Sequence, residues 1–229
     1  METKTTCAVI LARGGSKGLI NKNLRRVGNF SLLARSVLAC QKAGIDSVFV
    51  SSDSKDILEE ARGFGARSHA RSEFNSRDES SSEDAIVEFL DYLSLIDSKP
   101  ELIVFVQPTS PFLFSSDIRT CVRNTKPGES TFTAYSTGKF VWQKNSNVWE
   151  PLGHEKHKRL RRQEGFERVI ENGACYCFSM SDFLSNKSRF AEKATPILVP
   201  EFRSIEIDSL EELLEAQRLS LTFKCDWEG

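Results

Sequence analysis

The sequence predicts an α/β fold in which helices cover both faces of a doubly wound, mostly parallel sheet. Apolar strand-like runs alternate with segments of helical periodicity through the first 125 residues, and this alternation is typical of parallel strands joined by crossover helices. The strand-like runs lack polar alternation, as expected of strands that are buried on both faces. A chain of 229 residues can build one full core, so we expect a single domain over 1–229.

The elements of the first half follow one another at short intervals. Strands are predicted at 7–12, 47–51 and 102–106, and helices at 31–43, at 54–64, around 85–93 and from about 116. Ser31 and Gly44 are typical capping residues for the helix between them. Ser81 and Asp84 form a capping-box pattern before the third helix. The first half therefore reads as repeated strand–helix units.

The second half changes in character. Short strands or hairpin pieces are predicted at 131–136, 140–144, 147–150, 174–178 and 196–200. A basic run, 156–162, is poorly suited to a buried core, so we expect the segment 131–165 to form an arm or a flap. Ile205-Glu-Ile-Asp208 then leads into a helix capped by Ser209 and Glu212.

Composition excludes several classes of function. The 31 basic and 32 acidic residues give no overall positive field, so we expect no nucleic-acid partner. No apolar run approaches the roughly 20 residues that span a bilayer, and no signal-peptide pattern opens the chain. The six cysteines form no Cys-x-x-Cys pair, which favours buried free thiols in a reducing compartment over disulfides or zinc.

The run from Arg13 to Gly18, directly after the first strand, is the strongest local signal for a ligand. It places three glycines, a serine and two cations within six residues, a composition suited to a backbone anion nest with charge neutralisation. The pattern matches neither a P-loop nor a dinucleotide fingerprint. From the local pattern alone, a solvated glycine turn and a phosphate site both stay open.

Further polar residues follow other strands of the predicted sheet. Asp53 comes after the second strand and is a candidate ligand-binding residue, for which helix capping is an equal alternative. Gln107-Pro-Thr-Ser-Pro111 follows the strand at 102–106. In doubly wound sheets ligands collect outside the carboxyl ends of the strands. The sequence therefore predicts one ligand site at this edge.

Several motifs occur in a fixed order and cover about residues 7–218. They are the glycine loop, Ser51-Ser-Asp53, Gln107-Pro-Thr-Ser-Pro111, Asn172-Gly-Ala174 with Tyr176, and Ile205-Glu-Ile-Asp208. Together they resemble the N-acylneuraminate cytidylyltransferases, also called CMP-sialic acid synthetases. Arg71-Ser-Glu, the run 80–90 and Arg159-Leu-Arg-Arg-Gln163 are most similar to the animal members.

The resemblance implies a Rossmann-like nucleotidyltransferase fold and a defined reaction. The family transfers CMP from CTP to the anomeric hydroxyl of a sialic acid and releases pyrophosphate, with a divalent cation, Mg²⁺ or Mn²⁺. Two alternatives stay open: the same transfer to another acidic keto-sugar, such as deaminated neuraminic acid or a bacterial analogue, and a catalytically weak nucleotide-binding scaffold.

The resemblance also implies which residues bind CTP. They are Leu11, Ala12, Arg13, Gly14, Gly15, Ser16, Lys17, Lys22, Asn23, Arg71, Ser81 and Ser82. Arg13 and Lys17, with Asp208, are the implied catalytic residues, because they would neutralise or organise the reacting phosphates. The alternatives are a solvated surface lysine for Lys22 and a surface loop arginine for Arg71. For Ser81 and Ser82, the alternative role is helix capping.

The implied sugar-binding residues are Gln107, Tyr176, Arg162 and Gln163. A core tyrosine is the alternative for Tyr176. A solvated charge run or a nuclear-localisation patch is the alternative for the basic arm, and the resemblance makes these readings compatible.

Two carboxylates are the implied metal ligands, since Mg²⁺ prefers oxygen and keeps substrate phosphates in its shell. The family usually has Asp-Ile-Asp where this chain has Glu206-Ile-Asp208. Residues two apart on a strand point the same way, and the longer glutamate makes Asp208 the stronger ligand and the better group to help deprotonate the attacking hydroxyl. A second departure is Val141, which stands where many relatives carry a basic residue for the sugar carboxylate.

Assembly and location are also implied by the resemblance. Relatives are homodimers in which an arm of one subunit reaches the active site of the other, and residues 131–170 match that protruding arm in position. The C-terminal phosphatase-like domain of vertebrate relatives is expected to be absent. We expect the nucleus or the cytoplasm as the location, or the Golgi if an N-terminal targeting segment has been removed.

Overall fold

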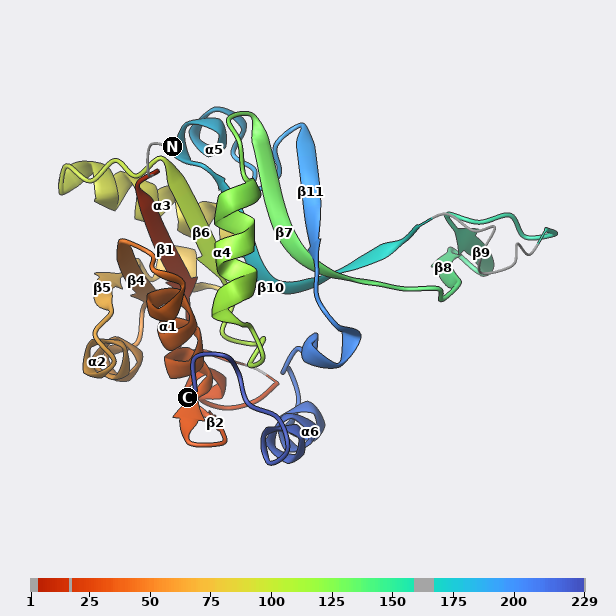
Figure 1. Cartoon of the computed structure of the whole chain (residues 1–229), viewed down its shortest axis with the longest axis horizontal. Coiled ribbons are helices and arrows are strands. Elements are labelled where there is room, and N and C mark those ends of the chain that lie inside the picture. Colours follow the sequence, from red (N-terminus) through yellow and green to blue (C-terminus); the bar gives the residue numbers. More distant parts are fainter. Residues whose placement is uncertain (1–3, 17, 159–166, 229) are drawn as a thin grey trace.

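The computed structural model describes residues 4–16, 18–158 and 167–228, and a mixed, mostly parallel sheet lies at its centre (Figure 1). In the described residues seven strands pair in the order β11-β7-β10-β6-β1-β4-β5. They are β1 (Thr6–Leu11), β4 (Ser47–Ser52), β5 (Arg67–Ala70), β6 (Leu102–Val106), β7 (Glu129–Ser136), β10 (Val169–Ser179) and β11 (Lys193–Leu198). Only β10 runs antiparallel to its neighbours, β6 and β7, so the predicted fold class is confirmed.

Helices cover both faces of this sheet. They are α1 (Leu32–Ala43), α2 (Lys55–Gly63), α3 (Ser82–Leu95), α4 (Ser115–Asn124), α5 (Met180–Asn186) and α6 (Leu210–Ser220), with short 3₁₀ turns η1 (Lys22–Leu24), η2 (Phe74–Ser76) and η3 (Glu201–Arg203). Ala8 and Ile10 of β1 belong to the apolar cluster under α1, α2 and α4. Cys7 and Val9 of the same strand belong to the cluster under α3 and α5. Both faces of β1 are therefore buried, as its unbroken apolar run predicts.

Helix boundaries follow the predicted caps. The Ser31 hydroxyl accepts a hydrogen bond from the Ala34 amide, and Gly44 closes α1 in the left-handed conformation at φ 80°. Ser81 and Asp84 form the predicted capping box of α3. These signals are local, so a sequence pattern is enough to find them.

Several elements differ from the prediction. The short edge strand β5 and the helix α5 were not predicted, and β10 extends well before 174–178. Residues 205–208 were treated as a strand, which is wrong. They form an irregular segment outside the sheet, and the Ile207 amide donates to the Thr109 carbonyl instead.

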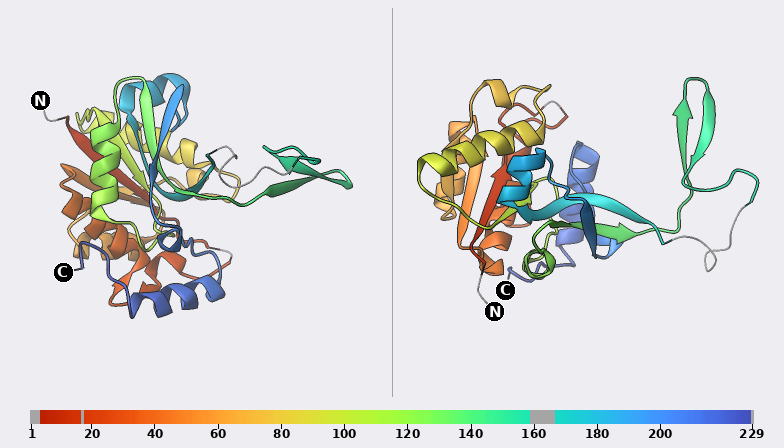
Figure 2. Two further views of the ribbon diagram at one scale, coloured as in Figure 1. Left: turned by 45° about the vertical axis from the view of Figure 1, so that its right-hand side comes forward. Right: turned by 90° about the horizontal axis from the view of Figure 1, so that it is seen from above.

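A hairpin projects from the compact body (Figure 2). It consists of β8 (Val141–Asn145) and β9 (Val148–Leu152), which pair only with each other. The predicted arm at 131–170 thus includes residues of the main sheet at both ends, because β7 reaches Ser136 and β10 begins at Val169. Two small strands, β2 (Arg26–Val27) and β3 (Phe30–Ser31), form a separate pair.

The cysteines are free thiols, as their spacing in the sequence predicts. All six cysteines are buried free thiols, and burial raises the pKa of the Cys7 and Cys40 thiols to about 12. In the described part of the chain no helix is both long and apolar enough to cross a membrane.

Candidate active site

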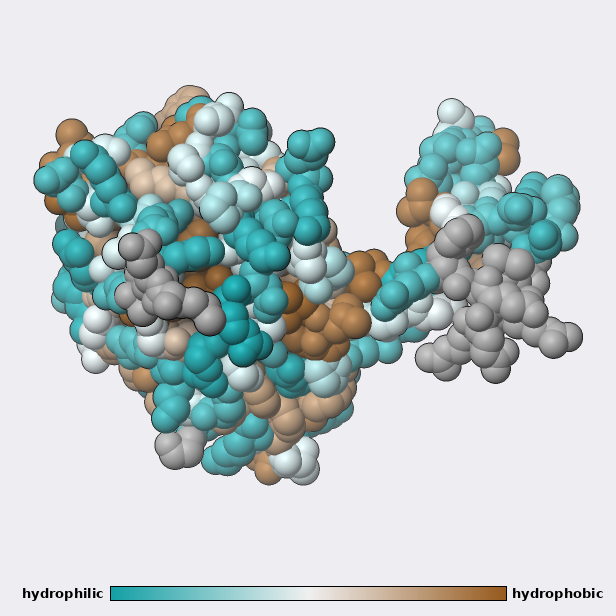
Figure 3. Space-filling model, turned by 45° about the horizontal axis from the view of Figure 1, so that its top comes forward, coloured by the Kyte–Doolittle hydropathy of each residue, from teal (hydrophilic) through white to brown (hydrophobic). Residues whose placement is uncertain are grey.

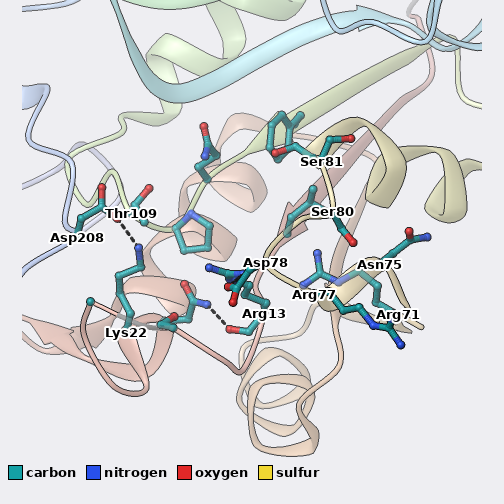
Figure 4. Close-up of a pocket in the computed structure, with 18 residues that line it drawn as sticks. Arg13, Lys22, Arg71, Asn75, Arg77, Asp78, Ser80, Ser81, Thr109 and Asp208 are labelled. Atoms are coloured by element: carbon teal, nitrogen blue, oxygen red, sulfur yellow. Dashed lines mark hydrogen bonds and ion pairs between the residues drawn. The ribbon is translucent and has the colours of Figure 1, made fainter. Parts of the chain in front are cut away.

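The carboxyl ends of β1 and β6 open into a cavity of about 410 Å³ (Figure 4). It is lined by Leu11, Arg13, Ser16, Gly18, Lys22, Asn23, Arg71, Asn75, Arg77, Asp78, Ser80, Ser81, Ser82, Phe105, Gln107, Pro108, Thr109 and Asp208. Most of the predicted nucleotide residues therefore meet Gln107 and Asp208 in one place. Eight lining residues are not among the predicted site residues: Gly18, Asn75, Arg77, Asp78, Ser80, Phe105, Pro108 and Thr109.

The glycine loop is held by its neighbours on both sides. The Gly14 amide donates to Asp53 Oδ1 at 2.9 Å, so this carboxylate braces the loop. The buried Asn23 donates from Nδ2 to the Arg13 carbonyl at 3.0 Å. A Cβ on Gly18 would lie 2.5 Å from the Asp208 carbonyl oxygen, which only glycine allows without a shift of backbone.

The predicted loop residues contribute unequally. Leu11, Arg13 and Ser16 line the cavity, whereas Ala12 is fully buried and donates its amide to the Ser51 carbonyl. Gly14 and Gly15 form the turn between Arg13 and Ser16. Lys17, a predicted catalytic residue, lies outside the described residues.

Two ion pairs cross the cavity between segments that are distant in sequence. Arg13 Nη1 lies 2.6 Å from Asp78 Oδ1, and Lys22 Nζ lies 2.6 Å from Asp208 Oδ1. Arg13 and Asp78 are each 38% exposed at the side chain, and Asp208 is 68% exposed. The Arg13–Asp78 pair is therefore weak, because solvent screens it and because both side chains lose entropy. Lys22 is only 16% exposed, so its pair with Asp208 is open to solvent mainly at the carboxylate. An incoming phosphate could replace Asp78 on Arg13 at little cost.

Arg71 is the most unusual residue of the cavity. Its side chain is nine-tenths buried, yet Nε and Nη2 have no hydrogen-bond partner among the described residues. Burial lowers the pKa of the guanidinium, while Asp53 and Glu88 oppose that shift. Buried guanidinium donors rarely stay unpaired in a folded protein. The unpaired donors therefore point to a ligand, and the alternative of a surface loop arginine for Arg71 is wrong.

Glu88 of α3 fixes the segment that carries Arg71. Its carboxylate accepts bonds from the Ser72 amide at 2.6 Å and hydroxyl at 2.7 Å, and from Asn75 Nδ2. Burial alone would raise the pKa of Glu88, but these donors outweigh it and the pKa is lowered. At the start of α3, Ser81 caps the helix while also lining the cavity beside Ser82. Capping of α3 and contact with a ligand in the cavity are thus compatible roles for Ser81.

Gln107 faces a cluster built by a bulge in β10. Gly173 adopts φ +68°, and a Cβ there would lie 3.3 Å from both Gln107 Oε1 and Glu206 Oε1. The preceding Asn172 is buried, and its Oδ1 accepts a bond from Thr133 Oγ1 at 2.7 Å. The bulge therefore places the side chains of Gln107 and Glu206 close together.

Tyr176 lies in the core instead of at the cavity wall. It is 2% exposed, its ring stacks on Phe105 at 5.6 Å, and its hydroxyl donates to Glu171. Burial and Glu171 raise the pKa of the phenol. Phe105 lines the cavity and Tyr176 does not, so the Phe105 ring stands between the Tyr176 ring and the cavity. A direct contact of Tyr176 with a sugar stays a prediction.

Glu206 and Asp208 are two carboxylates on the Lys22 side of the cavity. Burial first, and then the neighbouring Asp208, raises the pKa of Glu206, and Thr109 Oγ1 donates to it at 3.4 Å. Within the described residues no group of three or more His, Cys, Asp or Glu side chains could hold a metal by itself. Two adjacent carboxylates beside an open anion site fit Mg²⁺, which completes its shell with phosphates and water.

The arm contributes little to the described cavity. Val141 is 41% exposed in β8, and Lys139 pairs with Glu201 at 2.6 Å. Arg162 and Gln163, the predicted sugar-binding residues of the arm, lie outside the described residues.

Comparisons with known proteins agree on the family and the fold. A family model described as cytidylyltransferase matches residues 7–224. An N-acylneuraminate cytidylyltransferase of Oncorhynchus mykiss is 32% identical over 214 residues, which cover 90% of this chain and 48% of that protein. A CMP-N,N'-diacetyllegionaminic acid synthase of Legionella pneumophila is 29% identical and covers 88% of this chain and 90% of its own.

A solved structure gives an independent view of the fold. CMP:2-keto-3-deoxy-manno-octonic acid synthetase complexed with CTP superposes with a TM-score of 0.69 at 17% identity, covering 95% of this chain and 98% of that one. The chain thus shares a fold with a protein solved with CTP. It spans about half the length of the curated fish relative that it matches.

Proposed function

Because this chain belongs to the cytidylyltransferase family, we propose that it transfers CMP from CTP to the anomeric hydroxyl of N-acetylneuraminate. One observation carries the proposal: the glycine loop, the unpaired Arg71, Gln107 and Asp208 share a single cavity. Such a cavity can hold a nucleotide and an acceptor side by side. The O. mykiss relative supports N-acylneuraminate as the acceptor.

The donor half would bind CTP through charge and backbone amides. Arg13 and Lys22 would leave Asp78 and Asp208 for the triphosphate, with Lys17 as a further cation and the Gly15 amide as a donor, while the Gly14 amide stays on Asp53 and braces the loop. Arg71 would donate to the acceptor edge of cytosine, because its Nε and Nη2 form a free fork in a buried setting. Ser81 and Ser82 lie at the same wall.

The proposed reaction is a direct displacement. The anomeric oxygen bonds to the α-phosphorus of CTP, and the bond from that phosphorus to the bridging oxygen breaks. Pyrophosphate leaves with the bonding electrons, and the hydroxyl proton passes to a carboxylate, for which Asp208 is the exposed candidate. Gln107 would orient the polar groups of the sugar. Positioning and charge neutralisation then supply the catalysis.

We propose Asp208 and Glu206 as the residues that hold Mg²⁺ or Mn²⁺. A bound divalent ion would neutralise charge on the phosphates of CTP. Asp208 is 68% exposed at the side chain and, among the described residues, its carboxylate contacts Lys22 alone across the cavity, whereas Glu206 Oε1 accepts a bond from Thr109 and lies against Gly173, so Asp208 is the main ligand of the pair.

The decisive test is pyrophosphate release from CTP and Mg²⁺ with a panel of acceptors. N-acetylneuraminate, N-glycolylneuraminate and deaminated neuraminic acid are compared with a neutral hexose as the control. The proposal fails if none of the acidic sugars stimulates release. Lys22→Met should mainly raise the KM for CTP, and Gln107→Ala should mainly raise the KM for the sugar.

A second candidate is transfer to a different acidic keto-sugar. Val141 supports it, because the resemblance to N-acylneuraminate cytidylyltransferases implies a basic residue at that position. The L. pneumophila relative supports it as well, since its alignment covers nine-tenths of that protein. A panel that includes bacterial keto-sugars separates the two candidates by their kcat/KM ratios.

The third reading, a weak nucleotide-binding scaffold, rests on Glu206. Glu206→Asp separates it from an enzyme, since a scaffold stays inactive after the change while a working enzyme keeps or gains rate. CTP binding without any sugar-stimulated turnover in both proteins would support the scaffold.

We also propose a homodimer in which the arm of one subunit reaches the other's active site. The hairpin exposes large apolar side chains, and Figure 3 shows further apolar surface where the arm leaves the body. Those of the hairpin are Val141, Trp142, Val148, Trp149 and Leu152. A hairpin of this size without a core of its own needs a partner surface to bury them.

A further inference from the structure

Residues 222–228 form a strap that returns from α6 to the start of α4. In Figure 1 this dark blue segment runs back from α6 to the orange helix α1. Cys225 and Trp227 of the strap are only 4% and 8% exposed. The strap is thus packed into the body along residues 111–116, which continue the segment that carries Gln107 and Thr109.

A fully buried arginine joins the strap to this segment. Arg35 of α1 is 2% exposed, and its guanidinium has four partners. Nε donates to the Pro111 carbonyl at 2.8 Å, and Nη1 donates to the Val27 carbonyl at 2.8 Å. Nη2 pairs with Glu228 at 2.8 Å and contacts Cys225 Sγ at 3.4 Å. The charge is satisfied only when strap and loop are both in place.

The strap also caps α4. Asp226 accepts hydrogen bonds from the Ser115 and Ser116 amides at 2.8 and 2.9 Å, and from the Ser115 hydroxyl at 3.0 Å. Trp227 Nε1 donates to the Leu113 carbonyl at 3.0 Å. An acidic side chain at a helix N-terminus satisfies free amides and complements the helix dipole. Three separate contacts therefore fix the backbone between Leu113 and Ser116.

The fixed backbone continues directly into the cavity wall. The Ser110 amide donates to the Gln107 carbonyl at 3.3 Å, which makes a tight turn. The Ile207 amide donates to the Thr109 carbonyl at 2.8 Å, so the turn also sets the position of the Glu206–Asp208 segment. A displacement at Pro111 would move Gln107 and Asp208 together, because both are tied to this turn.

We propose that Asp226 and the Arg35–Glu228 pair are positioning residues that hold the Gln107 turn in register with the donor half of the cavity. This role rests on the proposed function, since Gln107 is there assigned to the acceptor sugar. Asp226 touches neither substrate in this assignment. It acts through the Ser115 and Ser116 amides and the turn before them.

The test compares Asp226→Ala with Ser179→Ala as a matched control. Ser179 caps α5 by accepting a bond from the Asp182 amide, on a helix that does not reach the cavity. Asp226→Ala should raise the KM for the sugar about tenfold and lower kcat, because small displacements of positioned groups cost rate steeply. The Kd for CTP should change less than twofold. Ser179→Ala should lose stability with unchanged kinetics.

Asp226→Asn supplies a rescue arm, since its amide oxygen still accepts from one backbone N–H while the charge is lost. It should recover most of the sugar KM. A purely structural role would instead move stability and both KM values in parallel for Asp226→Ala and Ser179→Ala, and that result overturns the proposal.

Hydrogen exchange of the substrate-free protein makes the outcome independent of the substrate. Asp226→Ala should speed exchange of amides 107–117 while the glycine loop keeps its protection. Unchanged exchange at 107–117 overturns the positioning role even if the sugar reaction is confirmed. Faster exchange there with no sugar-stimulated turnover upholds the coupling of strap and turn, and refutes only the proposed acceptor.

Discussion

Replacement of Arg71 by methionine should leave the free protein at least as stable while sharply weakening CTP binding. The side chain is nine-tenths buried, and two of its donor groups have no partner among the described residues. Methionine has a similar length and carries no donors. The substitution therefore removes the cost of the unpaired buried donors from the free protein. It also removes the proposed hydrogen bonds to cytosine from the complex with CTP.

The two effects can be sized separately. An unsatisfied buried donor costs about 1–3 kcal/mol, so Arg71→Met should raise the free energy of unfolding by about 1 kcal/mol after some loss of packing. A change of that size raises Tm by about 2–4 °C in a protein of this length. Two charge-assisted hydrogen bonds to cytosine at about 1.5 kcal/mol each amount to roughly 3 kcal/mol, which weakens CTP binding by roughly 100-fold.

Calorimetric titration with CTP and a thermal melt without ligand measure both effects on one preparation. Arg71→Lys is the control, because it keeps a charge but loses the planar fork that two hydrogen bonds need. It should weaken CTP binding without the gain in Tm. The reasoning is refuted if Arg71→Met lowers Tm by several degrees and leaves the Kd for CTP within threefold of the original.

Three further predictions follow from close contacts in the structure. Gly18→Ala should lower kcat/KM by about tenfold or more, because its Cβ would lie 2.5 Å from the Asp208 carbonyl oxygen. Gly63→Ala, at the end of α2 with no atom within 4 Å of the new Cβ, is the control and should be nearly silent; equal losses would contradict this. Glu88→Gln should lower the free energy of unfolding by about 1 kcal/mol at pH 7, and chemical denaturation should show the difference closing as the pH falls below about 4. The folded pKa of Glu88 lies below its ordinary value of 4.5, so its stabilisation is present above that value and is lost on acidification; a constant difference down to pH 3 would refute it. Trp149→Ser should shift the protein from dimer to monomer in light scattering, since the indole is 59% exposed on the hairpin, and an unchanged mass would count against the arm as the interface.

The sequence was sufficient wherever the determining contacts are local. The caps at Ser31 and Ser81, and the strand-to-loop junction at Arg13, depend on residues within three or four positions. The order of strands and helices then follows from burial periodicity. The cavity itself follows because parallel strands bring their carboxyl ends to one edge.

The remainder depends on contacts between distant segments. Asp78 meets Arg13 across 65 positions, and Asp226 caps α4 across 111 positions. The residue at the start of α4 is Phe114, whose side chain cannot accept a hydrogen bond, so the local pattern gives no cap to recognise. Tyr176 illustrates the opposite case: its place on a buried strand was visible, but the screening by Phe105 depends on pairing with β6.

The two halves of the donor site should differ in what they contribute to binding. At the phosphate end, Arg13 and Lys22 already have carboxylate partners, so CTP would replace one ion pair by another and the net gain would be modest and sensitive to salt. At the cytosine end, Arg71 has donors without partners, so each new hydrogen bond there is a full gain. Specificity for the base should therefore come from Arg71, while the salt dependence of affinity should come from the glycine loop and its ion pairs.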